Sequence, residues 1–242
     1  MSDWLDRTNL LLGTEKLDQL KNANVLVVGL GGVGAFAAEM ICRAGVEKMT
    51  IVDGDVVETT NRNRQLPALK STEGCRKTEI IGQRLLDINP DLELNSVFEF
   101  IRDEKAVELL KSQPFDYVVD AIDTLSPKVF LIHHCMKLGM NLVSSMGAGG
   151  KTDPSLVRVD DISKSYNCKL ARMIRKRLNK LGVKKGFKVV FSSEEVDENA
   201  IRVEEGQNKK SSVGTISYMP AVFGCYAASV VIRDLAHKQR KC

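Results

Sequence analysis

The sequence lacks any uncharged apolar run of about 18 residues, the length that a membrane-spanning helix requires. Its opening, MSDWLDRTNLLLG, has acids where a secretory signal would carry basic residues. These absences argue against a transmembrane segment and against export. We therefore expect a soluble, cytoplasmic protein.

Cysteine and proline are scarce, with six residues each, and aromatic side chains make up only 5% of the chain. The cysteines are dispersed without a C-x-x-C pair, which argues against a zinc knuckle and against a dense disulfide framework. No internal repeat and no bias typical of collagen, coiled coils or whole-chain disorder is present. A reducing cytoplasm is the simplest compartment for such a chain.

Hydrophobic residues make up 43% of the 242 residues, enough for a sizeable core. We expect residues 1–242 to form a single α/β domain, since such folds commonly reach about 250 residues. Apolar, β-branched runs predict strands at residues 23–28, 48–53, 93–98, 115–119 and 141–144. Apolar residues at helical spacing predict helices between them, at residues 36–44, 80–88, 106–110 and 129–138.

Strands that alternate with helices imply right-handed crossovers and a parallel sheet covered on both faces. Residues 1–150 are therefore predicted to form a doubly wound, Rossmann-like nucleotide-binding half. Residues 151–242 are predicted to form a smaller extension of mixed strands and helices on the substrate side. It would contain short strands, a basic helix, a mobile crossover loop at residues 192–212 and a C-terminal helix at residues 218–235.

A glycine motif, G-x-G-x-x-G, follows the first predicted strand and opens the first predicted helix; its members are Gly29, Gly31, Gly32 and Gly34. Such a loop lets backbone N–H groups approach phosphate. Asp53 ends the second strand, where a carboxylate accepts hydrogen bonds from ribose hydroxyls. A nicotinamide cofactor and ATP fit these features equally well.

The segment from Asp53 to Gln65 resembles the ATP-binding segment of the adenylyltransferase family that includes ubiquitin-activating-type, molybdopterin-synthase and thiamine-biosynthesis enzymes. That family has an acid followed by N-x-x-R-Q. The resemblance implies ATP and assigns nucleotide-binding or catalytic roles to Asp53, Asp55, Asn61, Arg64, Gln65, Lys77, Asp123 and Arg7. It also implies a homodimer in which Arg7 reaches the γ-phosphate in a neighbouring subunit.

The residue types suit adenylation, in which negative charge accumulates on phosphate oxygens as pyrophosphate leaves. Arg64 and Lys77 can supply fixed cations there, and Asp123 can hold Mg²⁺. Taken singly, the two cations could be surface charges, and Asp123 could simply cap a helix. Their shared order and spacing favour the nucleotide site.

Residues 192–219 contain no cysteine, whereas family members that pass on a ubiquitin-like protein often carry a catalytic cysteine there. Residues 147–154 and 159–164 instead resemble the branch of the family that dehydrates threonylcarbamoyladenosine in tRNA. That resemblance implies an acyl-adenylate intermediate, a tRNA partner and a monovalent cation near residues 147–150. Two alternatives stay open: activation of a sulfur-carrier or ubiquitin-like protein, with a sulfur-transfer or carrier protein as partner, and a redox enzyme or nucleotide sensor that binds NAD.

Basic residues gather between positions 164 and 188, where ten Lys and Arg occur without an acid, although the net charge of the whole chain is only +4. Such a run indicates either a solvated helix face or a surface that attracts a polyanion. With the tRNA resemblance, we predict tRNA contacts from Lys169, Arg172, Arg175, Lys176 and Arg177.

Overall fold

A computed structural model describes residues 4–102, 104–203 and 211–237 of the chain. Its strands are β1 (Asn24–Val28), β2 (Lys48–Val52), β3 (Glu93–Val97), β4 (Tyr117–Asp120), β5 (Leu142–Ser145), β6 (Val157–Asp161), β7 (Lys188–Ser192), β8 (Ile201–Val203) and β9 (Ser211–Val213). Its α-helices are α1 (Asp6–Leu12), α2 (Thr14–Lys21), α3 (Gly34–Arg43), α4 (Lys77–Ile88), α5 (Glu104–Lys111), α6 (Leu125–Lys137), α7 (Lys169–Lys180) and α8 (Tyr218–Ala236).

Seven strands form one sheet in the order β3-β2-β1-β4-β5-β7-β6. All neighbouring pairs are parallel except β6 and β7, which run antiparallel. The sheet joins strands from both halves of the chain, because β5 of the first half pairs with β7 of the second. The predicted fold class, a doubly wound and mostly parallel α/β sheet, is confirmed.

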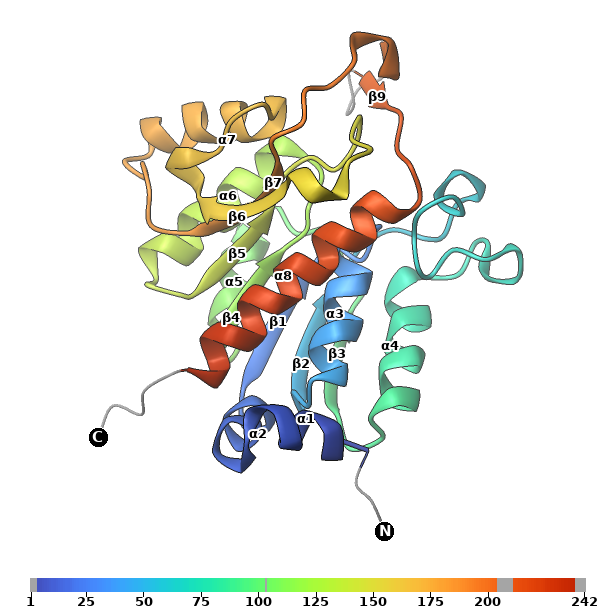
Figure 1. The fold of residues 1–242 in the computed structure, drawn as a ribbon, viewed down its shortest axis with the longest axis vertical. Helices are drawn as coiled ribbons and strands as arrows, with labels where there is room; N and C mark the ends of the chain where they lie inside the picture. The colour runs from blue at the N-terminus through green and yellow to red at the C-terminus, as the bar shows by residue number, and fades with distance from the viewer. Residues whose placement is uncertain (1–3, 103, 204–210, 238–242) are drawn as a thin grey trace.

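The central strand β1 is apolar along its length because both of its faces are buried, as is typical of parallel sheets. Val25 and Val27 point into a core shared with α3, α4 and α8, whereas Leu26 and Val28 point into a second core shared with α5, α6 and α7. Helices therefore cover both faces of the sheet (Figure 1). Each such buried side chain stabilises the fold by about 1.5 to 3 kcal/mol.

Helix α8 is, among the described helices, the one long and apolar enough to cross a membrane by length and composition. Its apolar residues, including Met219, Phe223 and Val231, are buried against α3 and the sheet. Packing in the core of the fold thus accounts for its apolar composition.

Two local features differ from the sequence prediction. Helices α1 and α2 were not predicted, because three consecutive leucines in α1 and two leucines in α2 are too few turns of apolar residues to give a helical spacing. The predicted crossover loop at residues 192–212 contains, in its described part, strands β8 and β9, which pair antiparallel. Strands of three residues are too short for an alternating pattern to be recognised, and residues 204–210 of that predicted loop lie outside the described residues.

A buried carboxylate joins α3 to α4. Glu39, whose side chain is 7% exposed, accepts hydrogen bonds from Arg43 at 2.8 Å and from Arg84 at 2.5 Å. Burial raises the pKa of the Glu39 carboxyl, but the hydrogen bonds and charges of the two arginines lower it more, so its pKa lies below the ordinary value of 4.5.

We expect Glu39→Gln to lower the free energy of unfolding at about pH 7 by about 1 kcal/mol, because both arginines are half exposed and water screens their charges. A lowered pKa in the folded state stabilises the protein above the ordinary pKa of 4.5 and stops doing so as the pH falls through the folded-state value. Urea unfolding from about pH 7 to about pH 3 should show the variant and parent converging in acid. A constant difference at all pH values would contradict this assignment.

Candidate active site

The candidate residues lie where three neighbouring strands end. The glycine motif follows β1, Asp53 follows β2, and Asp123 follows β4. Because β2, β1 and β4 are adjacent and parallel, their carboxyl ends meet at one edge of the sheet, the upper edge in Figure 1. Ligands of open α/β sheets bind at this edge.

At the first and last glycines of the motif, a side chain would collide with neighbouring backbone atoms. Gly29 has φ +92°, and a Cβ there would lie 2.8 Å from the carbonyl oxygen of Ala121. A Cβ on Gly34 would collide with the carbonyl oxygen of Gly29. A Cβ on Gly32 would lie 2.8 Å from Cβ of Pro220 and 3.3 Å from the carbonyl oxygen of Arg64, whereas Gly31 lies beside the side chain of Gln65. The motif therefore packs against both the chain after β4 and the predicted ATP-binding segment.

Asp53 fixes the glycine loop through its carboxylate. Oδ2 accepts a hydrogen bond from the backbone N–H of Leu30 at 2.6 Å, and Oδ1 accepts one from that of Asp55 at 2.7 Å. Burial raises the pKa of Asp53, although the charge of Lys77 and both N–H donors oppose the rise. A carboxylate oxygen accepts more than one hydrogen bond, so both oxygens can still accept from ribose hydroxyls.

Lys77 begins α4, and its side chain is only 5% exposed. Its Nζ lies 2.9 Å from Oδ2 of Asp55, whose side chain is 54% exposed. A buried ammonium group with one exposed partner keeps N–H donors available for a ligand. The pair therefore places a positive charge close to Asp53 at the edge of the site.

The N-x-x-R-Q segment forms a compact turn after the short helix Thr59–Asn61. Asn61 is buried, and its side chain accepts a hydrogen bond from the backbone N–H of Glu58 at 3.1 Å. Arg64 donates to the carbonyl of Thr60 at 3.0 Å. Gln65 has a buried Oε1 for which the described residues offer no hydrogen-bond partner. Such an unpaired acceptor beside the glycine loop is consistent with a site that a ligand completes.

The sequence motif did not indicate Asn63, because this residue lies between the fixed positions of the motif. Its Oδ1 accepts from Nη1 of Arg64 at 2.7 Å, and its Nδ2 donates to the carbonyl of Thr215 at 2.9 Å. Farther along the crossover, Tyr218 donates through its hydroxyl to the carbonyl of Thr152. The chain that leads from β9 into α8 is thereby held next to the predicted ATP-binding segment.

Asp123 is exposed between β4 and α6. The described residues contain no group of three or more His, Cys, Asp or Glu able to enclose a metal ion. Mg²⁺ commonly binds to one or two carboxylates together with substrate phosphates, so a single carboxylate here fits a metal that arrives with a nucleotide.

Arg7 lies apart from the other candidates. It is exposed on α1, at the lower end of Figure 1, whereas the glycine loop and Asp53 lie at the upper edge of the sheet. The structure therefore does not bring Arg7 to the site of its own chain. A neighbouring subunit could receive it, as the family resemblance implies.

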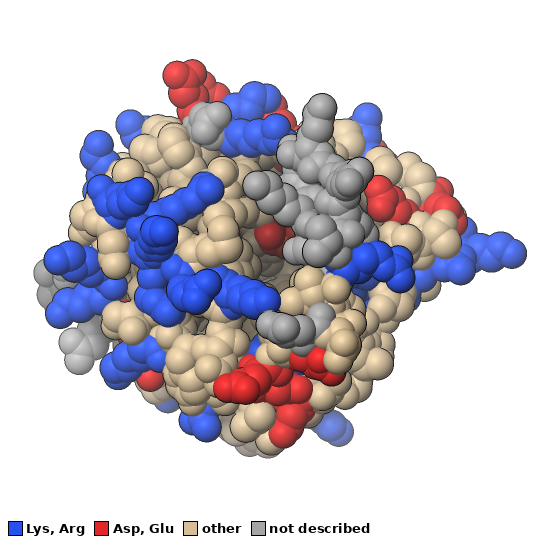
Figure 2. Space-filling view, turned by 90° about the horizontal axis from the view of Figure 1, so that it is seen from above, with Lys and Arg blue, Asp and Glu red and all other residues tan. Residues whose placement is uncertain are grey.

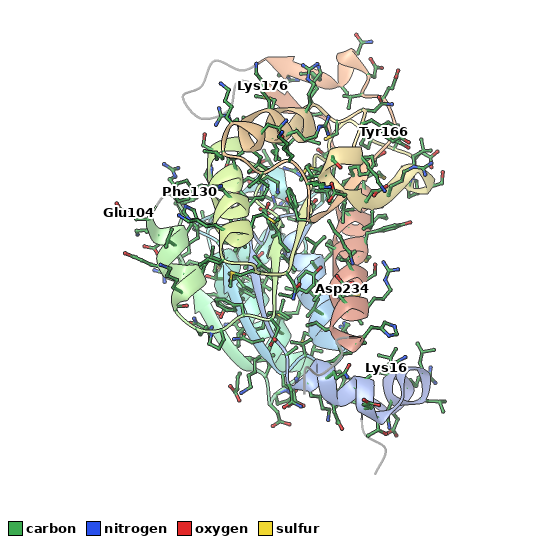
Figure 3. The ribbon with its side chains drawn as sticks, turned by 90° about the vertical axis from the view of Figure 1, so that its left-hand side faces the viewer. Lys16, Glu104, Phe130, Tyr166, Lys176 and Asp234 are labelled. Carbon is green, nitrogen blue, oxygen red and sulfur yellow. The ribbon has the colours of Figure 1, made fainter. Side chains whose placement is uncertain are left out.

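Helix α7 carries the predicted tRNA-binding residues. Lys and Arg side chains gather over its half of the upper face, beside a hollow (Figure 2). Lys176 projects at this end of the molecule, far from Lys16 at the other end (Figure 3). Arg175 is half-buried and bonds to Ser165, and Arg177 donates to Oγ of Ser126 at 2.8 Å. Lys169, Arg172 and Lys176 are exposed, and they are better placed to meet a polyanion than the two arginines that these bonds hold.

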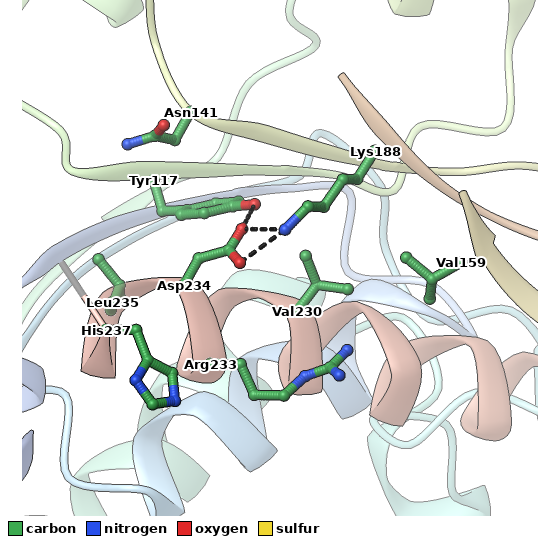
Figure 4. Close-up of a pocket in the computed structure, with 9 residues that line it drawn as sticks. All are labelled: Tyr117, Asn141, Val159, Lys188, Val230, Arg233, Asp234, Leu235 and His237. Atoms are coloured by element: carbon green, nitrogen blue, oxygen red, sulfur yellow. Dashed lines mark hydrogen bonds and ion pairs between the residues drawn. The ribbon is translucent and has the colours of Figure 1, made fainter. Parts of the chain in front are cut away.

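A cavity of about 670 Å³ lies at the opposite, amino edge of the sheet (Figure 4). Asp234 of α8 there accepts hydrogen bonds from the hydroxyl of Tyr117 at 2.8 Å and from Nζ of Lys188 at 2.6 Å. Burial and the adjacent Asp234 raise the pKa of Tyr117. These contacts tie α8 to the starts of β4 and β7. None of the predicted site residues lines this cavity.

A model of the ThiF family matches residues 5–241, so it spans both halves of the sheet. The chain belongs to the ThiF family. The tRNA threonylcarbamoyladenosine dehydratase of Bacillus subtilis is 40% identical to this ThiF-family chain over 237 residues, covering 95% of the chain and 93% of that relative. The Escherichia coli protein of the same name is 34% identical over 249 residues, covering 96% and 92%.

A solved structure of the E. coli tRNA N6-threonylcarbamoyladenosine dehydratase in complex with ATP resembles this ThiF-family chain with a TM-score of 0.87. The two are 33% identical, and the match covers 95% of this chain and 92% of the other. The family resemblance that the motifs indicated is therefore confirmed over nearly the whole length.

We expect Lys77→Met to lower the rate of ATP-dependent AMP formation about a hundredfold or more, with a much smaller change in the KM for ATP. The reason is that a fixed cation beside ATP stabilises most strongly the negative charge that develops on leaving pyrophosphate. Initial rates over a range of ATP concentrations separate the two effects. Lys70→Met is the matched control, because Lys70 is an exposed lysine seven positions before Lys77, in the chain that leads into α4. Parent-like turnover in the Lys77 variant would remove this residue from the site.

Proposed function

We propose that this chain is an ATP-dependent tRNA threonylcarbamoyladenosine dehydratase of the cytoplasm, acting as one adenylyltransferase-type domain over residues 1–242. The observation that carries the proposal is the 40% identity, over nearly the full length of both chains, to a dehydratase of that name. The gathering of Asp53, Lys77 and Arg64 around the glycine loop supports the ATP-binding part of this proposal.

ATP would bind at the carboxyl edge of β1, β2 and β4. Backbone N–H groups of the glycine loop and the start of α3 would hold its phosphates, and Asp53 would accept from its ribose. Asn61 would keep the following turn in shape through its bond to Glu58. Arg64 and Lys77 would then face the phosphates, and Gln65 would gain a partner for its buried oxygen.

Asp123 would hold Mg²⁺ together with the phosphates of ATP. The metal, when bound, neutralises charge on the phosphate oxygens and favours departure of pyrophosphate. A monovalent cation at residues 147–150 is a further proposal. Lys151, which follows that loop directly, is buried, and its ammonium group donates to the carbonyls of Asn167 and Glu194.

The reaction would proceed in two steps. The threonyl carboxylate of the modified nucleoside attacks the α-phosphorus of ATP, which forms an acyl-adenylate and releases pyrophosphate. The neighbouring carbamoyl group then attacks the acyl carbon, which closes a ring, expels AMP and loses one proton. The nucleoside loses one water overall, and ATP becomes AMP and pyrophosphate.

No enzyme thiol is needed in this sequence of steps, because the attacking group belongs to the substrate. The chain between positions 192 and 219 contains no cysteine. Cys168, the cysteine nearest to the basic helix, is buried, and its sulfur accepts a hydrogen bond from the backbone N–H of Ala171. A capping role for Cys168 favours direct cyclisation over a reaction in which this thiol forms a thioester with an activated carrier protein.

A homodimer is part of the proposal. Leu10 and Leu11 on α1 are 89% and 82% exposed, which is unusual for adjacent leucines on a helix. Arg7 lies on the same helix. A second copy of the chain that covers these leucines would bring Arg7 toward the γ-phosphate in its partner's site.

Mass spectrometry of tRNA nucleosides tests the proposed reaction. After incubation with the protein and ATP, threonylcarbamoyladenosine should lose the mass of one water, with one AMP formed per nucleoside. An intact nucleoside, together with ATP–pyrophosphate exchange that depends on a small carrier protein, would replace the proposal with carrier activation.

We expect replacement of Lys169, Arg172 and Lys176 by Gln to weaken tRNA binding and to leave ATP affinity nearly unchanged. For each tRNA phosphate that the variant no longer neutralises, the log–log dependence of affinity on salt should flatten by roughly 0.7 to 0.9. Fluorescence anisotropy over a series of salt concentrations measures both the affinity and its salt dependence.

Replacement of Lys16, Lys21 and Lys48 by Gln is the matched control, because it changes the net charge equally at the opposite end of the chain's fold. Lys21 and Lys48 form ion pairs with Glu47 and Glu93 at partly to largely exposed positions, and such pairs contribute little to stability. Equal weakening by both triple variants would show that tRNA responds to net charge and not to α7.

A further inference from the structure

A fully buried ion pair lies next to the candidate site. Asp120 is the last residue of β4, and Lys128 lies in the first turns of α6; both side chains are 0% exposed. Nζ of Lys128 lies 2.9 Å from Oδ2 of Asp120. Neither residue is part of the proposed ATP or tRNA contacts.

The side-chain hydrogen bonds of the pair lead to the turn after β4 and to the neighbouring strand. Lys128 donates to the carbonyl of Ile122 at 3.0 Å and to that of Asp120 at 3.4 Å, so its three N–H groups all have acceptors. Asp120 accepts from the backbone N–H of Ile122 at 3.1 Å and from Oγ of Ser144 at 2.6 Å. Both backbone polar groups of Ile122 are therefore held by this one pair.

The turn that the pair holds carries two parts of the candidate site. The carbonyl of Ala121 is the group against which Gly29 packs, and the N–H of Ala121 donates to the carbonyl of Val28 at 2.9 Å. Asp123, the proposed Mg²⁺ ligand, follows Ile122 directly. A shift of Ile122 would therefore move the support of the glycine loop and the carboxylate together.

Stability alone is a poor reason for such a pair. Moving two charges out of water is unfavourable, and apolar side chains of similar volume often stabilise a core equally well or better. A buried pair whose bonds converge on one turn does, however, fix the geometry of that turn.

We propose that Lys128 is a positioning residue, which acts through Asp120 and the backbone of Ile122 to hold the turn of residues 121–123 in the geometry that ATP and Mg²⁺ require. This inference rests on the proposed ATP site, but its first test needs neither nucleotide nor metal.

The decisive variant is the double substitution Asp120→Asn and Lys128→Met, which removes both charges without leaving either one unpaired. We expect it to unfold at a urea concentration near that of the parent. Amide hydrogen exchange at residues 121–124, measured without ligand, should become about tenfold faster. The turnover number for AMP formation should fall about tenfold to a hundredfold, and the Mg²⁺ concentration for half-maximal rate should rise about tenfold.

The double substitution Glu39→Gln and Arg84→Met is the matched control, because it removes a charge pair with a buried carboxylate between α3 and α4. It should leave the exchange of residues 121–124, the turnover number and the Mg²⁺ dependence unchanged. A folded Asp120/Lys128 variant with parent-like exchange and Mg²⁺ dependence would overturn the inference.

Ser144→Ala decides the question if the Asp120/Lys128 variant does not fold. It removes one hydrogen bond to Asp120 and leaves both charges in place. Loss of this hydrogen bond, worth about 1 kcal/mol, should lower the turnover number about fivefold and speed the amide exchange of Ile122. No change in either quantity would overturn the inference. If the parent protein does not dehydrate the nucleoside, the proposed function is rejected. The exchange measurement at residues 121–124 would still test whether Lys128 holds this turn, because it needs no ligand.

Discussion

The arrangement of the site depends on one topological constraint, the reversal of strand order between β1 and β4. These two strands are neighbours in the sheet, but the chain leaves β1 for α3 on one face and leaves β4 for α6 on the other. In open α/β sheets, ligands bind at the carboxyl edge beside such a reversal of strand order. The glycine loop and the turn of residues 121–123 meet at this edge, where Gly29 packs directly on Ala121.

Charge at this edge is arranged in layers. Asp120 and Lys128 lie fully buried, Lys77 is buried next to the half-exposed Asp55, and most of the Lys and Arg side chains of α7 are exposed on the same face. Exposed cations attract a polyanion over a distance, whereas buried ones act at fixed positions. In the proposed function, this one face would serve both the attraction of tRNA and the chemistry on ATP.

The sequence predicted the features that depend on local pattern. Buried parallel strands are continuous apolar runs, so the fold class could be predicted, and the fixed relation of the glycine motif and Asp53 to these strands assigns the candidate residues to one edge of the sheet. The Asp120–Lys128 pair could not be predicted, because nothing in the residues next to Lys128 indicates that its side chain is buried. The bond between Asn63 and Thr215 joins residues far apart in sequence, and so does the contact of Lys188 with Asp234. Likewise, the internal bonds of Arg175 and Arg177 are invisible in a run of basic residues.

Amide hydrogen exchange with and without ATP and Mg²⁺ is the most direct test of where the nucleotide binds. The carboxyl edge and the cavity lined by Tyr117, Lys188 and Asp234 lie at opposite ends of the same strands, so their peptides can be distinguished. Our account predicts slower exchange at residues 29–34, 53–65 and 121–125, and no change at residues 230–237. Protection confined to residues 230–237 and the start of β7 would contradict it.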